Sequence, residues 1–227
     1  MRAFRGFNSR ELHDYFVRHG YSFEREYVFD PFLNERLAAR LEELGGRVGK
    51  RRQILVYGRP GVHRNAFRLL VEALRKWIEL YPDSRRWEVV SAGEEHPAVY
   101  LDEGRVLVSA GKLSLDGYAD VLSESYAGVS LMASPHPSYP PLEMAAFGVH
   151  VITNGFAGKD LSSFGESVVS VPTPTVDALA RTLVEVCEGY EAEVACGRVR
   201  EGYLTCEEPF DFLPELAELI RERTARD

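Results

Sequence analysis

The chain has 227 residues, of which 45% are hydrophobic and 27% are charged. It is therefore long enough for one ordinary domain with a buried core and shorter accessory segments, and its composition excludes a disordered chain. The formal net charge of −8 excludes general binding to nucleic acid or anionic membranes, which both need a basic surface. We interpret the short basic cluster around residues 47–52 as a solvated linker, with a partner or phospholipid contact as the alternative.

The cysteines, histidines and N-terminal residues exclude several further classes of protein. Cys187, Cys196 and Cys206 form no CxxC pair, which predicts reduced thiols in a cytoplasmic protein. The six histidines are dispersed without zinc-ligand spacing, and no G-x-S-x-G motif is present. No signal peptide and no membrane-spanning stretch is recognisable. We expect a cytoplasmic protein without a metal ion, which reaches the inner face of the membrane only through partners.

Residues 54–200 alternate apolar β-type runs with helical patterns. This alternation predicts βαβ units, and hence an α/β fold with a Rossmann-like, doubly wound parallel sheet. The expected strands are 54–57, 87–90, 106–108, 129–133, 149–153 and 167–171. The expected helices of this region are 64–80, one capped by Ser114, and one capped by Thr175 that ends near Val186.

Both ends of the chain look like helical accessories. The first 50 residues contain helix candidates at 9–19 and 31–44, the second with Asp30 at the cap and Pro31 in the first helical position. A last helix is expected at 211–223.

Two glycine-containing turns follow expected strands. Gly58 and Gly61 permit a tight turn after the first strand, and the flanking Arg59 and Arg64 suit phosphate oxygens. The alternative is an ordinary strand-to-helix loop with surface arginines. The second turn is Gly111-Lys112-Leu113, where a ligand can approach the main chain and a flat base can pair with it. A simple loop with a helix cap is the alternative there.

The segment Ser134–Gly148 is the most informative part of the sequence. Four prolines stiffen its loop, which leads to a helix that we expect to open at Leu142 and Glu143. A carboxylate at this place in an open α/β sheet suits sugar hydroxyls, and His136 and Tyr139 lie in the same loop. The alternatives are a glutamate favoured only by the helix dipole and a histidine with a structural hydrogen bond. Later in the chain, Lys159 is either a solvated lysine or a group that neutralises a diphosphate.

Together, these motifs resemble the C-terminal half of GT-B glycosyltransferases. More narrowly, the sequence resembles family-4-type bacterial polysaccharide enzymes and WsaF-like rhamnosyltransferases, over roughly residues 20–225 and most strongly over 105–160. The Ser-Pro-His-Pro-Ser-Tyr-Pro-Pro-Leu-Glu run is the specific part. The resemblance implies a domain that binds a nucleotide-sugar, with dTDP-rhamnose as the donor, no metal, and a saccharide acceptor held by an N-terminal domain or a partner chain.

The resemblance also implies roles for individual residues. Arg59 and Arg64 would hold the diphosphate and, with His136, form the catalytic group. The donor-binding residues would be Gly58, Gly111, Lys112, Leu113, Tyr139 and Glu143, with the base at residues 111–113 and the ribose at Glu143. Two departures stand out: an arginine at 64 where many relatives have lysine, and Pro135 where many have an additional glutamate.

The expected organisation has three segments: a linker or remnant of an acceptor domain with its hinge (1–50), the nucleotide-sugar-binding domain (51–204), and a C-terminal helix packed on it (205–227). Because the first segment is too short for an acceptor domain, catalysis by this chain alone stays open. One alternative is a binding module that senses a nucleotide-sugar without chemistry. Another is a docking partner that uses Phe4, Phe7, Tyr15 and Phe16. The sequence leaves the donor sugar, the acceptor, the stereochemical outcome and the oligomeric state undecided.

Overall fold

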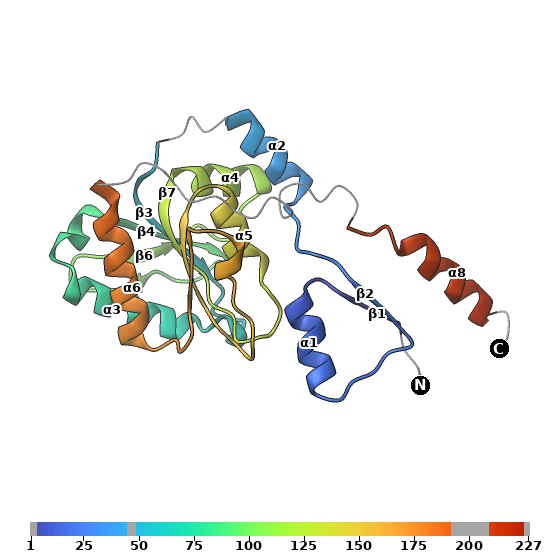
Figure 1. The fold of residues 1–227 in the computed structure, drawn as a ribbon. Helices are drawn as coiled ribbons and strands as arrows, with labels where there is room; N and C mark the ends of the chain where they lie inside the picture. Colours follow the sequence, from blue (N-terminus) through green and yellow to red (C-terminus); the bar gives the residue numbers. More distant parts are fainter. Residues whose placement is uncertain (1–3, 45–48, 192–208, 225–227) are drawn as a thin grey trace.

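The computed structural model describes residues 4–44, 49–191 and 209–224, and a seven-stranded sheet lies at its centre (Figure 1). The strands are β3 (Arg51–Gly58), β4 (Glu88–Gly93), β5 (Val99–Tyr100), β6 (Val106–Ser109), β7 (Ser125–Val129), β8 (His150–Asn154) and β9 (Val168–Val171). Their order is β5-β6-β4-β3-β7-β8-β9, and only β5 is antiparallel to its neighbour. The chain runs outward from β3 to β6 and then returns to β7 beside β3, which is the Rossmann order. The predicted fold class is confirmed.

Two layers of helices bury the sheet on both faces. α3 (Phe67–Leu80) and α6 (Val176–Glu188) cover one face, while α2 (Glu35–Leu44), α4 (Leu115–Glu124) and α5 (Tyr139–Ala146) cover the other (Figure 1). Ile54 and Val56 of β3 belong to the first apolar cluster, and Leu55 belongs to the second. Successive side chains of a strand point to opposite faces, so burial of both faces explains why this run is continuously apolar.

The helix expected at 64–80 is interrupted near its start. His63–Asn65 form a 3-10 turn, Ala66 adopts a φ of 49°, and only then does α3 begin. The caps expected at Ser114 and Thr175 are confirmed, because their side chains accept the amides of Gly117 and Ala178. Further 3-10 turns lie at Pro82–Arg86, Ser162–Phe164 and Gly189–Glu191.

The strand expected at 129–133 was placed wrongly, because β7 is Ser125–Val129 and the apolar run after it is a loop. β7 contains the small residues Ser125, Ala127 and Gly128, and every residue of the strand is buried. A Cβ atom added to Gly128 would lie 2.7 Å from the Met144 Sδ of α5. Close packing of α5 therefore selects a glycine here, which a hydrophobicity pattern does not reveal.

Helix α5 begins three residues before the expected start. It opens at Tyr139, so Pro140 and Pro141 lie in its first turn, where the missing N–H groups have no partner to lose. Ser138 precedes it with a φ of 64°. Glu143 is consequently one turn inside α5, and the expectation that it opens the helix is wrong.

Residues before α2 form a small unit of their own, β1 (Phe4–Phe7), α1 (Arg10–Arg18) and β2 (Arg25–Val28). The two strands pair in parallel as a separate sheet, and neither was expected. α1 was expected, and Ser9 caps it by accepting the Leu12 amide at 3.1 Å. Phe7 is fully buried in this unit, with the Phe16 ring centroid 5.6 Å away. Of the four residues predicted for a docking surface, Phe7 is therefore buried, while Phe4, Tyr15 and Phe16 are partly exposed.

Helix α2 starts at Glu35 and not at Pro31, so Asp30 and Pro31 are not its cap and first residue. The Asn34 side chain accepts the Arg36 amide at 2.9 Å, and Leu33 is buried against the sheet-facing cluster. The Asn34 hydrogen bond and the burial of Leu33 explain why the helix begins at Glu35, four residues after the proline that suggested its start.

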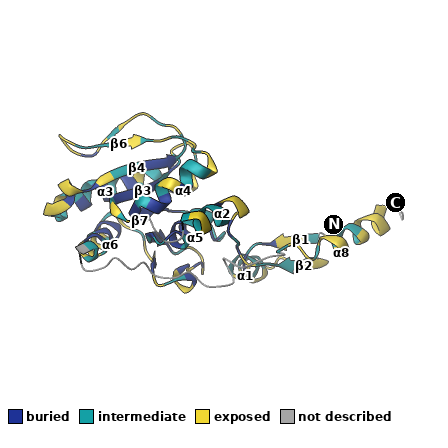
Figure 2. Ribbon diagram, turned by 90° about the horizontal axis from the view of Figure 1, so that it is seen from above, coloured by how far each residue is buried: buried dark blue, intermediate teal, exposed yellow. Residues whose placement is uncertain are grey.

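The last helix, α8 (Leu213–Thr224), contacts the N-terminal unit. The Phe212 ring stacks on Tyr27 with centroids 4.5 Å apart, and Arg223 lies 3.5 Å from Glu24. No residue of α8 is buried, and Figure 2 shows this helix in yellow and teal next to β1 and β2, away from the dark blue strands of the main sheet. Cys196 and Cys206 lie outside the described residues, while Cys187 is a buried free thiol. The division into three segments stays a prediction.

Candidate functional site

A cavity of about 420 Å³ opens at the carboxyl ends of β3 and β4. Its walls come from the ends of these strands, from the loop after β6 with the start of α4, and from the first turns of α5. The lining residues are Tyr57, Arg59, Ala92, Gly93, Lys112, Leu113, Leu115, Tyr118, Tyr139, Pro140 and Glu143. The strand order reverses between β3 and β7, so the cavity lies at the switch point where open α/β sheets bind ligands.

Five of the predicted site residues line this cavity together: Arg59, Lys112, Leu113, Tyr139 and Glu143. The two predicted glycines precede lining residues directly. Gly111 has a φ of 67°, a conformation that favours glycine, and its carbonyl accepts the Gly93 amide at 2.9 Å. Gly58 is buried, and a side chain there would collide with Ser91. These glycines shape the turns from which Arg59 and Lys112 extend.

Glu143 is the acidic group of the cavity among its lining residues. Burial raises the pKa of its carboxyl to about 7, and a hydrogen bond from the Tyr118 hydroxyl opposes the shift. Near neutral pH the carboxyl therefore exchanges readily between its charged and neutral forms. A carboxylate in such surroundings accepts hydrogen bonds from hydroxyl groups strongly, because little water competes for it.

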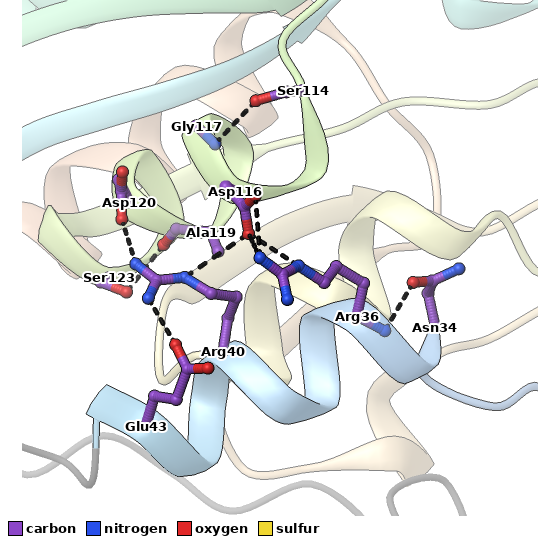
Figure 3. A network of polar contacts seen from close by, with 10 residues as sticks. All are labelled: Asn34, Arg36, Arg40, Glu43, Ser114, Asp116, Gly117, Ala119, Asp120 and Ser123. Carbon is purple, nitrogen blue, oxygen red and sulfur yellow. Dashed lines mark hydrogen bonds and ion pairs between the residues drawn. The ribbon is translucent and has the colours of Figure 1, made fainter.

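Helix α4 brings Leu115 and Tyr118 to the cavity, and helix α2 holds α4 in place. Arg36 of α2 makes two hydrogen bonds to Asp116, at 2.9 and 3.1 Å, and Arg40 donates to Asp120 at 2.8 Å (Figure 3). Leu37 of α2 is fully buried in the cluster that also contains α4 residues. Helix α2, which precedes the main sheet in the chain, thus supports the wall of the cavity that α4 forms.

His136 and Arg64 are not among the lining residues of this cavity, although both were predicted as site residues. The Arg64 carbonyl accepts the Ala133 amide at 2.7 Å, which ties the first turn to the proline loop, and its side chain is exposed. The pKa of His136 is lowered by burial and then by the positive charges of Arg64 and Lys159. Arg64 and Lys159 therefore lie close enough to His136 to act on its charge.

The hydrogen bonds of His136 define its tautomer. Nδ1 accepts the Ser138 amide at 3.0 Å, so the neutral ring carries its proton on Nε2. Nε2 lies 2.7 Å from the terminal amide of Asn8, which then presents its oxygen to the ring. This contact joins the N-terminal unit to the proline loop, and makes His136 a donor on its Nε2 side.

Lys159 is not a solvated lysine. Only 2% of the residue is exposed, and its Nζ donates to the Met132 carbonyl at 2.8 Å. Burial lowers the pKa of its ammonium to about 8. Asn154 binds the same peptide from another side, accepting the Met132 amide at 2.7 Å and donating to its carbonyl at 3.2 Å. The main chain leading to the proline loop is therefore firmly held.

Several residues of the site were not foreseen from the sequence. Tyr57, Tyr118 and Leu115 line the cavity, and Asn8 contacts His136. Tyr118 had a usable signal, because it follows the Ser114 cap by one helical turn and so faces the same way. Asn8 had none, because 128 positions separate it from His136.

Among residues 4–44, 49–191 and 209–224, no group of three or more histidine, cysteine, aspartate or glutamate side chains is arranged to hold a metal ion. None of the helices there combines the length and apolar character needed to cross a bilayer.

The fold is that of GT-B glycosyltransferases, as comparison with solved structures shows. Sucrose-phosphate synthase from Thermosynechococcus elongatus matches with a TM-score of 0.59 at 15% identity, over 99% of this chain and 59% of that chain. WaaG, a glycosyltransferase involved in lipopolysaccharide biosynthesis, gives 0.59 at 13% identity, over 81% of this chain and 53% of that chain. The pneumococcal O-GlcNAc transferase GtfA, in complex with UDP and GlcNAc, matches with a TM-score of 0.60 at 12% identity, over 96% of this chain and 45% of that chain. At such low sequence identities, these matches show a shared fold and nothing more specific.

The sequence defines the family more narrowly. Residues 52–184 match the model of the family described as WsaF, C-terminal domain, and the chain belongs to this family. It is also 38% identical over 141 residues to the O-antigen biosynthesis protein RfbC of Myxococcus xanthus, which covers 60% of this chain. The matched part spans only 11% of RfbC. The resemblance to WsaF-like GT-B enzymes seen in the motifs is thereby confirmed.

Proposed function

We propose that this chain is the donor-binding part of a glycosyltransferase that acts in bacterial surface polysaccharide synthesis. One observation carries the proposal: a single cavity at the switch point presents Arg59, Lys112 and Glu143 together. Two cationic side chains suit a diphosphate, and a carboxylate suits the hydroxyls of a ribose. The proposed ligand is a nucleoside-diphosphate sugar, with dTDP-rhamnose as the donor.

In this proposal each part of the ligand has its own contacts. The base lies against residues 111–113, Glu143 accepts the ribose hydroxyls, and Tyr139 packs beside them. Arg59 and Arg64 stabilise the negative charge that develops on the departing diphosphate, the kind of electrostatic term that dominates many such reactions. His136 lies at the reacting end, with its Nε2 hydrogen bonded to Asn8. These cationic groups supply the countercharge, so the proposed reaction uses no metal ion.

The relatives support the biological setting of the proposal. RfbC is named for O-antigen biosynthesis, WaaG for lipopolysaccharide biosynthesis, and GtfA is described with UDP and GlcNAc bound. We place this chain in the cytoplasm, acting on a saccharide acceptor. The acceptor is presented across the crevice by a further domain or a partner chain, and partners hold the assembly at the inner face of the membrane.

Thermal unfolding in the presence of dTDP, UDP, GDP, ADP and phosphate tests the proposal. A ligand at one hundred times its dissociation constant adds about 2.7 kcal/mol to the free energy of unfolding. We expect one nucleoside diphosphate to stabilise the chain most, and Glu143→Ala to reduce that stabilisation. Glu185→Ala, on the exposed side of α6, is the matched control. If no nucleotide stabilises the chain, the proposal fails and a docking role without nucleotide binding becomes the better account.

A further inference from the structure

The half-buried side chain of Glu94 contacts the turn that follows β3. Strand β4 ends at Gly93, so Glu94 is the first residue of the loop after it. The Gly61 amide donates to both oxygens of the Glu94 carboxylate, at 3.2 and 3.3 Å. The Glu94 amide itself donates to the Gly58 carbonyl at 3.0 Å. Glu94 therefore holds both ends of the turn that leads out of β3.

Gly61 makes room for this carboxylate. A Cβ atom added to Gly61 would lie 2.6 Å from Glu94 Oε1, which is closer than atoms in folded proteins approach. The φ of Gly61 lies outside the left-handed region, so the backbone conformation does not require a glycine at this position. The glycine is explained by the hydrogen bond that it permits, a reason that the sequence alone does not reveal.

Arg59 belongs to the same turn and reaches the cavity from it. The Arg59 carbonyl accepts the Val62 amide at 3.0 Å, which closes the turn. A Cβ atom on Gly93 would lie 3.2 Å from Arg59 Cγ, so the stem of the side chain runs over that glycine. Arg59 lines the cavity at the carboxyl ends of β3 and β4. Within the described part of the chain it forms no ion pair, so its charge is available to a ligand.

The main chain of Glu94 is fixed from the other side by the loop after β6. The Ser109 hydroxyl donates to the Glu94 carbonyl at 3.0 Å and accepts the Gly111 amide at 3.1 Å. Lys112, which also lines the cavity, follows directly. Glu94 thus joins the two loops from which the cations of the cavity extend.

A carboxylate at this place has a cost, because its negative charge lowers the local positive potential that attracts phosphate. In return it makes a stronger hydrogen bond to the Gly61 amide than a neutral acceptor would. We propose that Glu94 positions Arg59, by fixing the turn after β3 so that the guanidinium extends into the cavity. This inference rests on the proposed function and adds Glu94 to it as a positioning residue, which does not itself contact the donor.

Calorimetric titration of dTDP and pyrophosphate with the full chain tests this role, using variants that break the contact from either side. Glu94→Ala removes the acceptor. Gly61→Ala places a methyl group where the carboxylate lies and leaves the amide in place. Glu94→Gln removes the charge but keeps an oxygen that can accept the Gly61 amide. Glu103→Ala is the matched control, because Glu103 is exposed and precedes β6, at the opposite edge of the sheet from the cavity.

We expect Glu94→Ala and Gly61→Ala each to weaken dTDP binding about tenfold, as for the loss of a hydrogen bond to a charged group. The two substitutions together should weaken it no further, because they break the same contact. Glu94→Gln and Glu103→Ala should bind dTDP nearly as tightly as the wild type. In a chain that carries Arg59→Ala, Glu94→Ala should change dTDP binding no further, because no guanidinium remains to be positioned.

A role of Glu94 in loop structure alone would make the losses from Glu94→Ala and Arg59→Ala additive. Additive losses, or equal dTDP affinity in Glu94→Ala and wild type, would overturn the inference and leave the proposed function standing. Pyrophosphate binding that depends on both Glu94 and Arg59, in a chain without dTDP affinity, would keep the positioning role and refute the nucleotide proposal.

Discussion

Replacing Glu143 with glutamine should stabilise the chain at alkaline pH while weakening nucleotide binding. Burial raises the pKa of this carboxyl from its ordinary 4.5 to about 7. Between these pH values the folded chain holds the proton more tightly than the unfolded chain, so the free energy of unfolding falls as pH rises. At pH 8 this shift lowers the free energy of unfolding by about 3 kcal/mol. Below pH 4.5 it lowers the free energy of unfolding by almost nothing. Glutamine carries no charge and avoids this cost.

Urea unfolding from pH 4.5 to pH 8.5 measures the effect. The difference in the free energy of unfolding between Glu143→Gln and wild type should grow with pH, up to about 3 kcal/mol, and level off above pH 8. Glu185→Gln, on the exposed side of α6, is the matched control. The dTDP affinity of Glu143→Gln should fall about tenfold, since a hydrogen bond to a charged acceptor is lost. A pH-independent difference in stability would refute the burial argument for Glu143.

Three further outcomes follow from the packing. Leu37→Ala should lower the free energy of unfolding by about 2–5 kcal/mol in urea titrations, because Leu37 is fully buried where α2 meets the sheet; a loss below 1 kcal/mol would mean that α2 is loosely attached. A double-mutant cycle on Arg36→Gln and Asp116→Asn should give a coupling of about 0.5–1 kcal/mol that declines with salt, as expected for an exposed bidentate pair; a salt-independent coupling would contradict this. Gly128→Ala should lower the melting temperature through an overpacking cost of about 1–3 kcal/mol, whereas Gly104→Ala, with its nearest neighbouring atom 3.9 Å from an added Cβ, should be nearly neutral.

The sheet was predictable because its signals are local. Residues 54–56 are buried on alternate faces of the sheet and form a continuous apolar run, while Ser114 and Thr175 indicate helix starts because their side chains can cap a helix. β7 was misplaced because packing against Met144 selects a glycine at position 128, which interrupts the apolar run there. The start of α5 was misplaced because two consecutive prolines suggest a loop, although the first turn of a helix accepts them.

The site residues likewise divide into those that local sequence predicts and those that depend on long-range contacts. Arg59, Lys112 and Glu143 are foreseeable because each follows a strand whose carboxyl end faces one edge of the sheet. The burial of Lys159 depends on a carbonyl 27 positions away, and the contact of His136 on a residue 128 positions away. β1 and β2 escaped prediction because four-residue strands that pair in parallel across a helix leave little local pattern. Long-range contacts of this kind appear only once the chain is folded.

A crystal structure of the chain with dTDP tests the central claim most directly. The account predicts the ribose within hydrogen-bond distance of Glu143, the first phosphate against Arg59, and the base beside residues 111–113 at the carboxyl ends of β3 and β4. A nucleotide bound elsewhere on the chain, or an empty crevice at millimolar dTDP, would contradict it.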